Sequence, residues 1–387
     1  MDKIFRQAHL NAIQTALNNY PITALLGPRQ CGKSTISRTI GENYKAQKGL
    51  PIHFFDLEDI YDLQRISNIK LALDHLEGLI IIDEIQLKPE LFPYLRVLAD
   101  RYPDRRYLIL GSASRDLIEK ASETLAGRIE YVELTPFSLS EISNQEKLLQ
   151  RGGFPRSVLA MDSEVSFNWR KSYIQSYLER DLPFFGIKLP TIDLYRFWIM
   201  VANYHGQLIN FSEIGCVLGL SDQTIRRYIS ILQQTFMVRC LQPWFANIAK
   251  RQIKTPKLYL RDSGIYQALL DIRPNELDLH PKKGAAWEGF AIEEIIRQYK
   301  ARPEECFFWR SSQGAEIDLL IVRGEKKFGF EVKYSDHPSV TKSMRTAIND
   351  LNLSELNIVI PIVDAHYYLE ENIKVVGLNS CSYPTLK

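Results

Sequence analysis

Gly27-Pro28-Arg29-Gln30-Cys31-Gly32-Lys33-Ser34-Thr35 directly follows the apolar run Ile22 to Leu26. Its spacing matches G-x-x-x-x-G-K-[ST], a phosphate-binding loop that connects a strand to a helix. The glycines let backbone N–H groups turn toward an anion, and the helix adds the positive end of its dipole. In this pattern Lys33 reaches the β- and γ-phosphates, and the Ser34 hydroxyl binds magnesium. The stretch therefore predicts a nucleotide-binding α/β domain in which all nine residues of the loop contact the cofactor.

Such a loop requires an acidic element on another strand, and Leu79-Ile80-Ile81-Ile82-Asp83-Glu84 supplies it. An apolar run that ends in a carboxylate is typical of a buried central strand. Asp83 is predicted to hold Mg²⁺ beside Ser34, and Glu84 to orient and deprotonate the attacking water. A further strand, 107–110, ends in Gly111-Ser112-Ala113-Ser114, which places hydroxyls near a γ-phosphate. Because no Asn-Lys-x-Asp or Thr-Lys-x-Asp box for guanine is visible, we expect ATP with Mg²⁺.

The first 140 residues alternate apolar strands with helical stretches. The expected strands are residues 22–26, 52–55, 79–82, 107–110 and 129–134. This alternation predicts a mainly parallel sheet with helices on both faces, an α/β core over residues 1–140. Residues 141–200 have stronger helical periodicity, and we interpret them as a small helical lid.

The composition excludes several classes of protein. With 387 residues, 45% of them hydrophobic and 24% charged, the chain is typical of a globular protein with several domains. No apolar run approaches the roughly 20 residues of a membrane span, so we expect no membrane partner. Residues 1–6 lack the apolar region of a signal peptide, which predicts a cytoplasmic protein. The five cysteines form no C-x-x-C pair, and Cys31 is expected to have a lowered pKa inside the phosphate loop.

Residues 201–275 have the pattern of a winged helix-turn-helix. Phe211 to Leu218 forms a short helix, Gly219 turns the chain, and Ser221 caps a helix that runs to about residue 235. Two strands, 237–241 and 258–260, are predicted to form the wing. The N-terminal half of the second helix, which enters the major groove of DNA in this motif, carries Gln223, Thr224, Arg226 and Arg227.

The charge distribution supports a DNA partner. Residues 221–261, which we call the basic window, hold eight basic residues and one acidic residue, a net charge of 8 − 1 = +7. The whole chain has a net charge of +2, so the remainder totals −5. A local basic surface of this kind neutralises phosphates. The alternative is a packing module with a solvated basic face.

The C-terminal segment 280–387 holds a third set of polar residues. Asp318 lies in one expected strand and Glu331-Val332-Lys333 in the next, with a turn near residues 323–325. Residues i and i+2 of a strand share a face, so Glu331 and Lys333 project together and the hairpin brings Asp318 beside them. Carboxylates in this arrangement bind a magnesium ion that activates water against a phosphodiester, with Glu288 completing the set. Lys333 either orients that water or stabilises the developing charge. Glu-x-Lys alternation is also frequent on exposed strands, and such folds also serve as scaffolds.

These motifs resemble known families. The phosphate loop, Asp83-Glu84 and the serines after the fourth strand resemble the AAA+ superfamily of P-loop ATPases, with Ser112 or Ser114 in the position of its polar sensor. Asp followed by Glu-x-Lys on the next strand resembles the PD-(D/E)xK restriction-endonuclease-like fold. The order of core, lid, winged helix and nuclease-like tail resembles a prokaryotic AAA+ family with a C-terminal domain of unknown function.

Arg128 is the arginine that the AAA+ resemblance singles out. It follows Gly127, the expected C-cap of a helix over residues 115–126. We predict that it stabilises transition-state charge, either in its own subunit or in a neighbouring subunit of a homo-oligomer. Arg115 competes for this role, and a surface ion pair of Arg128 with Glu123 or Glu130 is the alternative.

Two functions are compatible with this pattern. In the first, the protein hydrolyses ATP to remodel or recognise DNA, including branched DNA, and its nuclease-like tail either cuts DNA or grips it. In the second, the ATP state controls oligomerisation or a protein partner, and the C-terminal domains are interaction surfaces that do not cleave DNA. DNA stimulates hydrolysis in the first case and leaves it unchanged in the second.

Overall fold

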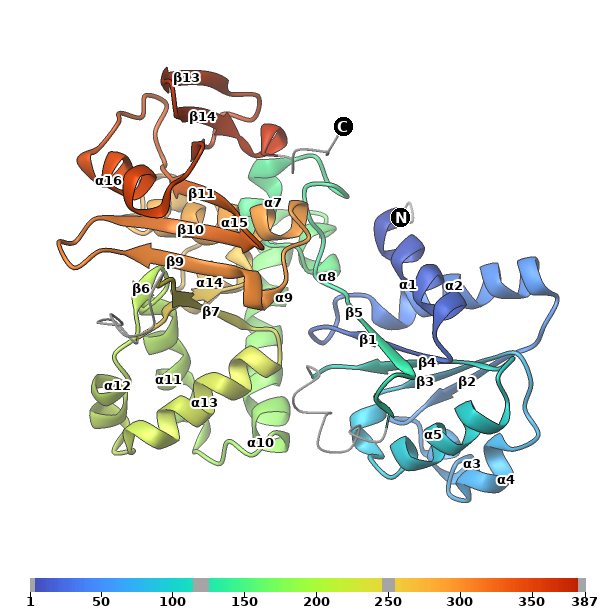
Figure 1. Cartoon of the computed structure of the whole chain (residues 1–387). Coiled ribbons are helices and arrows are strands. Elements are labelled where there is room, and N and C mark those ends of the chain that lie inside the picture. Colours follow the sequence, from blue (N-terminus) through green and yellow to red (C-terminus); the bar gives the residue numbers. More distant parts are fainter. Residues whose placement is uncertain (1–3, 114–124, 246–254, 382–387) are drawn as a thin grey trace. The chain divides into compact units, whose positions relative to one another are not determined.

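The computed structural model describes residues 4–113, 125–245 and 255–381 (Figure 1). The contacts between residues divide the chain into two compact units. The first unit holds residues 1–137 and 234–236, and the second holds residues 138–233 and 237–387. Among the described helices, none combines the length and the apolar character that crossing a membrane requires.

The first unit alternates helices and strands as its sequence predicts. Its elements are α1 (Gln7–Asn19), β1 (Ile22–Leu26), α2 (Lys33–Lys48), β2 (Ile52–Asp56), α3 (Ile60–Arg65), α4 (Ile69–Leu73), β3 (Leu79–Asp83), the 3₁₀ turn η1 (Ile85–Leu87), α5 (Leu91–Arg101), β4 (Arg106–Gly111) and β5 (Ile129–Glu133). Among the described residues, the strand order is β2-β3-β4-β1-β5, and all four pairings are parallel. The predicted α/β core with a parallel sheet is therefore confirmed.

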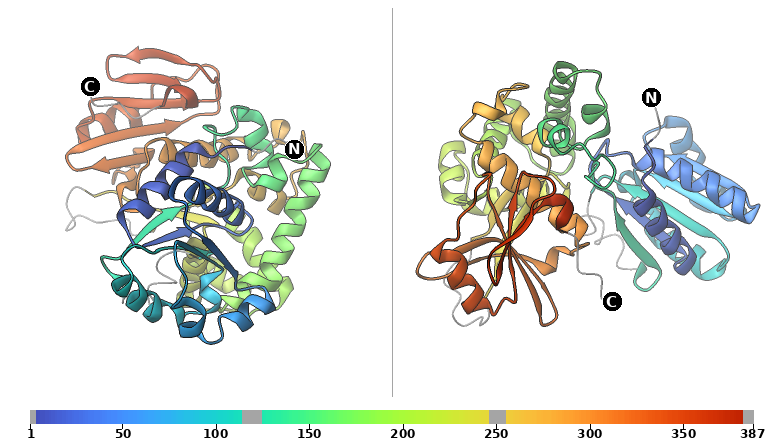
Figure 2. Two further views of the ribbon diagram at one scale, coloured as in Figure 1. Left: turned by 90° about the vertical axis from the view of Figure 1, so that its right-hand side faces the viewer. Right: turned by 90° about the horizontal axis from the view of Figure 1, so that it is seen from above.

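Helices cover both faces of this sheet, which is why its central strands are continuous apolar runs. Figures 1 and 2 show α1 and α2 on one face and α3 to α5 on the other. Successive strand residues alternate between these layers. Leu25 and Ile81 pack with α1 and α2, whereas Ala24 and Ile80 pack with α4 and α5.

The strand order brings three chain segments to one edge of the sheet. Parallel strands end on the same edge, and β4 lies between β1 and β3. The phosphate loop follows β1, Asp83 ends β3, and Ser112 follows β4. Residues that are up to 85 positions apart in the sequence, from Gly27 to Ser112, therefore meet at this carboxyl edge.

The second unit joins helices to a large mixed sheet. Its helical elements are α7 (Gln145–Arg151), α8 (Pro155–Val158), α9 (Ser163–Ser176), the π-helical turn η3 (Tyr177–Asp181), α10 (Leu182–Phe184), α11 (Thr191–Asn203), α12 (Phe211–Leu218), α13 (Asp222–Gln234), α14 (Ser263–Leu269), η5 (Leu277–Leu279), α15 (Lys283–Gln298), η6 (Pro303–Glu305), α16 (Lys342–Leu351) and η7 (Leu378–Ser380). Its strands are β6 (Gln207–Leu208), β7 (Val238–Pro243), β8 (Lys257–Leu260), β9 (Cys306–Arg310), β10 (Glu316–Arg323), β11 (Lys326–Val332), β12 (Leu356–Ile360), β13 (His366–Glu370) and β14 (Ile373–Gly377).

The strands expected as a wing belong to the same sheet as the C-terminal strands. Over the described residues this sheet has nine strands in the order β13-β14-β12-β11-β10-β9-β7-β8-β6. Strand β7 pairs with β8 on one side, and on the other side Gln242 and Pro243 pair in parallel with Phe307 and Phe308 of β9. The segments expected as a helical lid, a winged helix and a nuclease-like tail are thus packed into one unit. Their separation into domains at residues 200 and 275–280 stays a prediction.

Candidate functional site

The phosphate loop has two residues with left-handed backbone and one glycine that packs closely against its surroundings. Gly32, at the start of α2, has a φ of 102°, and Gln30 has a φ of 60°. A Cβ atom on Gly27 would lie 2.1 Å from the carbonyl oxygen of Leu134. Glycine at 27 therefore lets the loop pack closely against the segment that follows β5.

Lys33 and Ser34 open the helix that follows this loop. The buried ammonium of Lys33 donates to the carbonyl oxygens of Gly27 at 2.9 Å and Pro28 at 3.0 Å, so the lysine reaches across the loop. The hydroxyl of Ser34 donates to Oδ2 of Asp83 at 2.6 Å. The structure therefore brings together the serine and the aspartate that were predicted to bind magnesium.

The chemistry of this donor set fits a magnesium nucleotide. Hydroxyl and carboxylate oxygens are the ligands that Mg²⁺ prefers, and a lysine within a glycine-rich loop suits phosphate oxygens. Burial raises the pKa of Asp83, and the hydrogen bond from Ser34 opposes this shift. A nearby cation stabilises the charged form of a buried carboxylate, so it opposes the rise in pKa that burial causes.

The side chain of Glu84 is held by Gln86, a residue for which the sequence predicts no role. Its backbone has a φ of 52°, in the left-handed region that a non-glycine residue rarely adopts, and strain of this kind is common at functional sites. The amide Nε2 of Gln86 donates to a carboxylate oxygen of Glu84 and, at 3.0 Å, to the hydroxyl of the buried Ser112. Gln86 thus joins the predicted base to the predicted sensor. Only its position two residues after Glu84 could have suggested this.

Arg128 lies at the opposite edge of the sheet. Its backbone carbonyl accepts a hydrogen bond from Ile22 at the start of β1, whereas the phosphate loop follows the end of that strand. A strand of this length spans roughly 16 Å. The guanidinium binds Asp100 with Nε–Oδ1 and Nη2–Oδ2 distances of 2.5 and 3.0 Å. Arg128 therefore lies away from the phosphate loop of its own chain, and its ion-pair partner is Asp100. The alternative partner Glu123 lies outside the described residues. Ser114 and Arg115 lie outside the described residues.

Cys31 also differs from its expectation. The thiol is buried and lies 3.4 Å from the carbonyl oxygen of Leu134, to which it donates. Burial raises the pKa of Cys31, and the nearby Lys33 and Arg6 only partly oppose this shift. Desolvation outweighs the positive field of the loop, so the expected lowering of the pKa is wrong.

The four residues predicted to contact DNA lie on the first two turns of α13. Gln223, Arg226 and Arg227 are exposed, and Thr224 is half-buried. Arg226 pairs with Asp222 at 3.1 Å, and its guanidinium carbon lies 3.9 Å from the centre of the Phe211 ring. One nitrogen of Arg227 donates to the carbonyl oxygen of Gly186 at 3.3 Å. Two exposed arginines therefore lie near the N-terminus of this helix, and each contacts a different neighbouring segment.

Much of the basic window is neutralised within the second unit. Arg239 donates twice to the buried Glu293, with the second bond at 3.1 Å, and Nε of Arg261 donates to the same carboxylate at 3.2 Å. Lys257 pairs with acidic residues of the C-terminal strands. Three of the five described basic residues of the window, Arg239, Lys257 and Arg261, thus contact carboxylates outside it. The net charge of +7 overstates the positive surface, because sequence counting misses these long-range partners.

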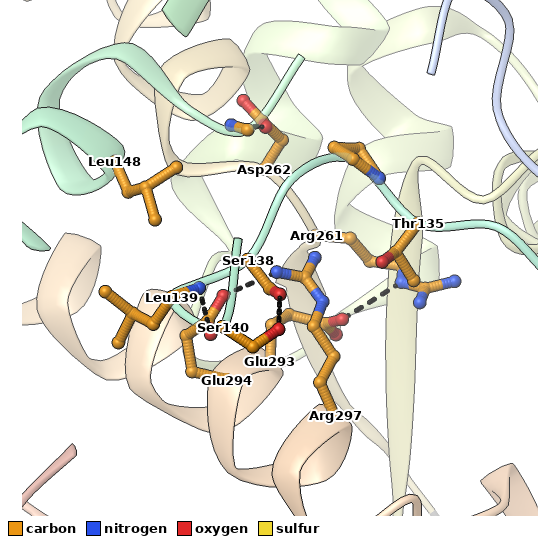
Figure 3. Close-up of polar contacts among 12 residues, drawn as sticks. Thr135, Ser138, Leu139, Ser140, Leu148, Arg261, Asp262, Glu293, Glu294 and Arg297 are labelled. Carbon is orange, nitrogen blue, oxygen red and sulfur yellow. Dashed lines mark hydrogen bonds and ion pairs between the residues drawn. The ribbon is translucent and has the colours of Figure 1, made fainter. Parts of the chain in front are cut away.

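Figure 3 shows the polar contacts that surround Glu293. Nε of Arg261 donates to the carboxylate of Glu293, and Nη1 of Arg297 donates to Oε1 of the adjacent Glu294 at 2.6 Å. Glu294 also accepts a hydrogen bond from the backbone N–H of Leu139 at 3.0 Å. Asp262, in the same view, accepts bonds from the backbone of Gly153 and Ile265 at 2.8 Å each. These contacts join residues 139–153 to the start of α14 and to α15.

The residues predicted for a nuclease-like site do meet. The backbone N–H of Val332 donates to Oδ2 of Asp318 at 2.9 Å, which places that carboxylate at the strand between Glu331 and Lys333. Nζ of Lys333 lies 2.6 Å from Oε1 of Glu331. The hydroxyl of Tyr259 donates to Oε1 of Glu288 at 2.6 Å. We call Glu288, Glu316, Asp318 and Glu331 the carboxylate cluster.

The carboxylate cluster does not fit the predicted magnesium ion. Within the described residues, no group of three or more His, Cys, Asp or Glu side chains is arranged to hold a metal ion. Instead, the ammonium of Lys257 lies 3.3 Å from Asp318 and 3.9 Å from Glu288, and it also pairs with Glu316. The predicted ligands Glu288, Asp318 and Glu331 are correct as neighbours but wrong as a metal site, because a lysine lies among these carboxylates.

Three family models match the chain. The model described as an AAA domain matches residues 19–143. Two models described as domains of unknown function, DUF8612 and DUF4143, match residues 142–276 and 283–381. The AAA match covers the phosphate loop and Asp83, so the P-loop ATPase core rests on both sequence and structure.

Two mycobacterial proteins match most of the chain. The uncharacterized proteins Rv2008c of Mycobacterium tuberculosis and Mb2031c of Mycobacterium bovis are each 44% identical to it over 353 residues, 90% of this chain and 78% of theirs. Among solved structures, the Walker-type ATPase paby2304 of Pyrococcus abyssi is 16% identical, with a TM-score of 0.49, and the match covers 70% of this chain and 96% of that one.

Proposed function

Because this chain belongs to the family of the mycobacterial proteins Rv2008c and Mb2031c and carries an AAA P-loop ATPase domain, we propose that it is a magnesium-dependent ATPase with a role at DNA. The observation that carries the proposal is the meeting of Lys33, Ser34, Asp83 and Glu84 at one edge of a parallel sheet. The family alone does not specify the reaction, so the proposal rests on these residues.

Each of these residues has a separate task in the proposed reaction. The loop N–H groups and Lys33 bind the phosphates, and Ser34 and Asp83 hold the magnesium ion. Once bound, that ion neutralises charge on the β- and γ-phosphates. Glu84 orients water and takes its proton, with its carboxylate held by Gln86. In this proposal the hydroxyl of Ser112, which accepts a hydrogen bond from the same Gln86 amide, contacts the γ-phosphate.

Arg128 acts on a neighbouring subunit in this proposal. It lies at the amino edge of its own sheet, beside Ile22, and its side chain is about one-third exposed. An arginine supplied in trans stabilises transition-state charge, and this requires that the site of one subunit face Arg128 of another. We therefore propose a homo-oligomer in which the ion pair with Asp100 opens when subunits associate.

The proposed DNA surface is the N-terminal half of α13. Exposed Gln223, Arg226 and Arg227 can contact a groove or its phosphates, with Thr224 beside them, as in helix-turn-helix proteins. In this proposal residues 141–200 form the lid, 201–275 a winged helix and 280–387 a nuclease-like fold. Arg226 and Arg227 carry the proposal because their side chains are exposed, whereas Arg239, Lys257 and Arg261 contact carboxylates outside the window.

A second candidate function follows from that internal pairing. Since Arg239, Lys257 and Arg261 are neutralised within the second unit, much of the charge that favours DNA is structural. An ATP-dependent switch that controls oligomerisation or a protein partner, without DNA cleavage, requires no basic surface. The two functions differ in whether DNA changes the rate of hydrolysis.

A steady-state ATPase assay with duplex, single-stranded, forked and four-way DNA tests both functions. We expect hydrolysis by the wild type, none by Glu84→Gln, and an unchanged rate for the control Glu90→Gln, whose carboxylate is exposed and paired with Lys88. Stimulation by DNA that is lost in Arg226→Ala/Arg227→Ala supports the DNA role. Hydrolysis that no DNA form changes supports the switch. Absence of hydrolysis under every condition contradicts the ATPase proposal.

A further inference from the structure

Lys257 is the only residue of the described basic window whose charged group lies among the carboxylate cluster. Its ammonium pairs with Glu316 and lies 3.3 Å from Asp318 and 3.9 Å from Glu288. The residue is 6% exposed. Burial alone lowers the pKa of Lys257, but Asp318, Glu288 and Glu316 outweigh this effect and raise it above its ordinary value. The lysine is therefore charged at neutral pH.

The backbone of Lys257 holds this position firmly. Lys257 begins β8, where it pairs with Leu241 of β7 on one side and Leu208 of β6 on the other. The ammonium also lies 5.8 Å from the centre of the Phe308 ring. A buried side chain on a strand with neighbours on both sides cannot leave the cluster without breaking three ion pairs.

We propose that the ammonium of Lys257 is the resident cation of the carboxylate cluster, in place of the divalent ion that the nuclease-like pattern requires. Three carboxylates contact this one buried charge, and the fourth, Glu331, pairs with Lys333. Glu316 also lies 3.6 Å from Nε of Arg310. A divalent ion would compete for the same oxygens and would lie close to a fixed positive charge. The cluster therefore binds no Mg²⁺ or Mn²⁺ in the wild-type protein, and the second unit does not cut DNA by metal-activated water.

One unpartnered atom indicates how the cluster changes when the lysine is removed. Oε2 of the buried Glu331 has no hydrogen-bond partner among the described residues. Once Lys257 is replaced, this atom and the oxygens of Asp318 and Glu288 provide hard donors that Lys333, which pairs with the other oxygen of Glu331, leaves available. Lys257→Met should therefore create a divalent-ion site that the natural chain lacks.

Mn²⁺ titration of the full chain, without nucleotide and followed by electron paramagnetic resonance, tests this proposal. All variants carry Asp83→Asn to disable the predicted magnesium site of the first unit. The chain with Lys257 intact is expected to bind no Mn²⁺ at concentrations below about 1 mM, which is the weak end of the affinities of protein calcium sites. Lys257→Met is expected to gain a Mn²⁺ site. Adding Asp318→Asn to Lys257→Met should remove that site. The matched control is Lys333→Met, which removes a lysine that pairs with Glu331 but leaves Lys257 in place, and it should gain none.

Three results would overturn the proposal. The first is that the chain with Lys257 intact binds Mn²⁺ with a dissociation constant below about 1 mM and that Asp318→Asn abolishes this binding. The second is an equal gain in Lys333→Met and Lys257→Met. The third is no gain in Lys257→Met that retains the wild-type circular dichroism. Because the measurement on Lys257-intact protein and its Asp318→Asn partner needs no change at Lys257, the proposal stays open to contradiction even if Lys257→Met does not fold.

Discussion

Replacement of Glu293 by glutamine should destabilise the second unit strongly. Glu293 is 2% exposed and accepts three hydrogen bonds, two from Arg239 and one from Arg261. Glutamine preserves the size of the side chain but removes its charge, which leaves two arginines without their carboxylate. Removing one partner of a buried ion pair costs about 3–5 kcal/mol. We expect the free energy of unfolding of this unit to fall by that amount at pH 7.

The effect should depend on pH in a defined direction. Burial alone would raise the pKa of Glu293, but Arg239 and Arg261 outweigh it and hold the pKa well below its ordinary value. A carboxyl group with a lowered pKa stabilises the folded state above its unfolded pKa, about 4.3, and this contribution is lost as the pH falls further. The difference between wild type and Glu293→Gln should therefore be full at pH 7 and shrink below about pH 4.3.

Denaturant unfolding followed by tryptophan fluorescence is the appropriate assay. All five tryptophans, Trp169, Trp198, Trp244, Trp287 and Trp309, lie in the second unit, so the signal reports on this unit alone. Glu304→Gln is the matched control, since its carboxylate is 64% exposed and surface pairs contribute about 0–1 kcal/mol. A loss below about 1 kcal/mol for Glu293→Gln at pH 7 would refute the buried-pair reasoning.

Three further predictions concern the nucleotide site and α13. Gln86→Leu should lower kcat roughly 10- to 100-fold with little change in KM, because Glu84 loses its positioning partner; equal kcat would contradict this. Gly27→Ala should weaken ATP binding about tenfold or more in calorimetry, since its methyl group would lie 2.1 Å from a backbone oxygen; unchanged affinity would mean that the loop has room. In filter binding, Arg226→Ala with Arg227→Ala should weaken DNA binding and lower the slope of log K against log salt by about two; an unchanged slope would place DNA on another surface.

The sequence predicted the first unit better than the second. Consecutive residues carry the phosphate loop, and a strand with a terminal carboxylate identifies Asp83, so short-range patterns suffice for the loop, the order of elements and the parallel sheet. The position of Gln86 could not be predicted, because an amide beside an acid has no chemical signature until the turn η1 folds it back. The left-handed backbone of Glu84 has no signal in the sequence either.

In the second unit, the errors came from contacts distant in sequence. The charge of Arg239 is neutralised by Glu293, 54 positions later, and Lys257 meets Asp318, 61 positions later. Counting charges within a window treats such residues as exposed. The hairpin of β10 and β11 was predictable because its turn is local, whereas the parallel pairing of β7 with β9 depends on tertiary packing. The prediction of a metal site in the carboxylate cluster was wrong for the same reason, because Lys257, which competes for these carboxylates, comes from the distant strand β8.

The most direct test of the central claim is calorimetric titration of magnesium ATP into the wild type and Lys33→Ala. Lys33 is buried and bonded to its own loop, so its loss removes a charge that phosphates require without exposing a core. We predict saturable binding by the wild type and none by a folded Lys33→Ala. Equal affinity in the two proteins, or no heat of binding in the folded wild type, would contradict the assignment of the phosphate loop.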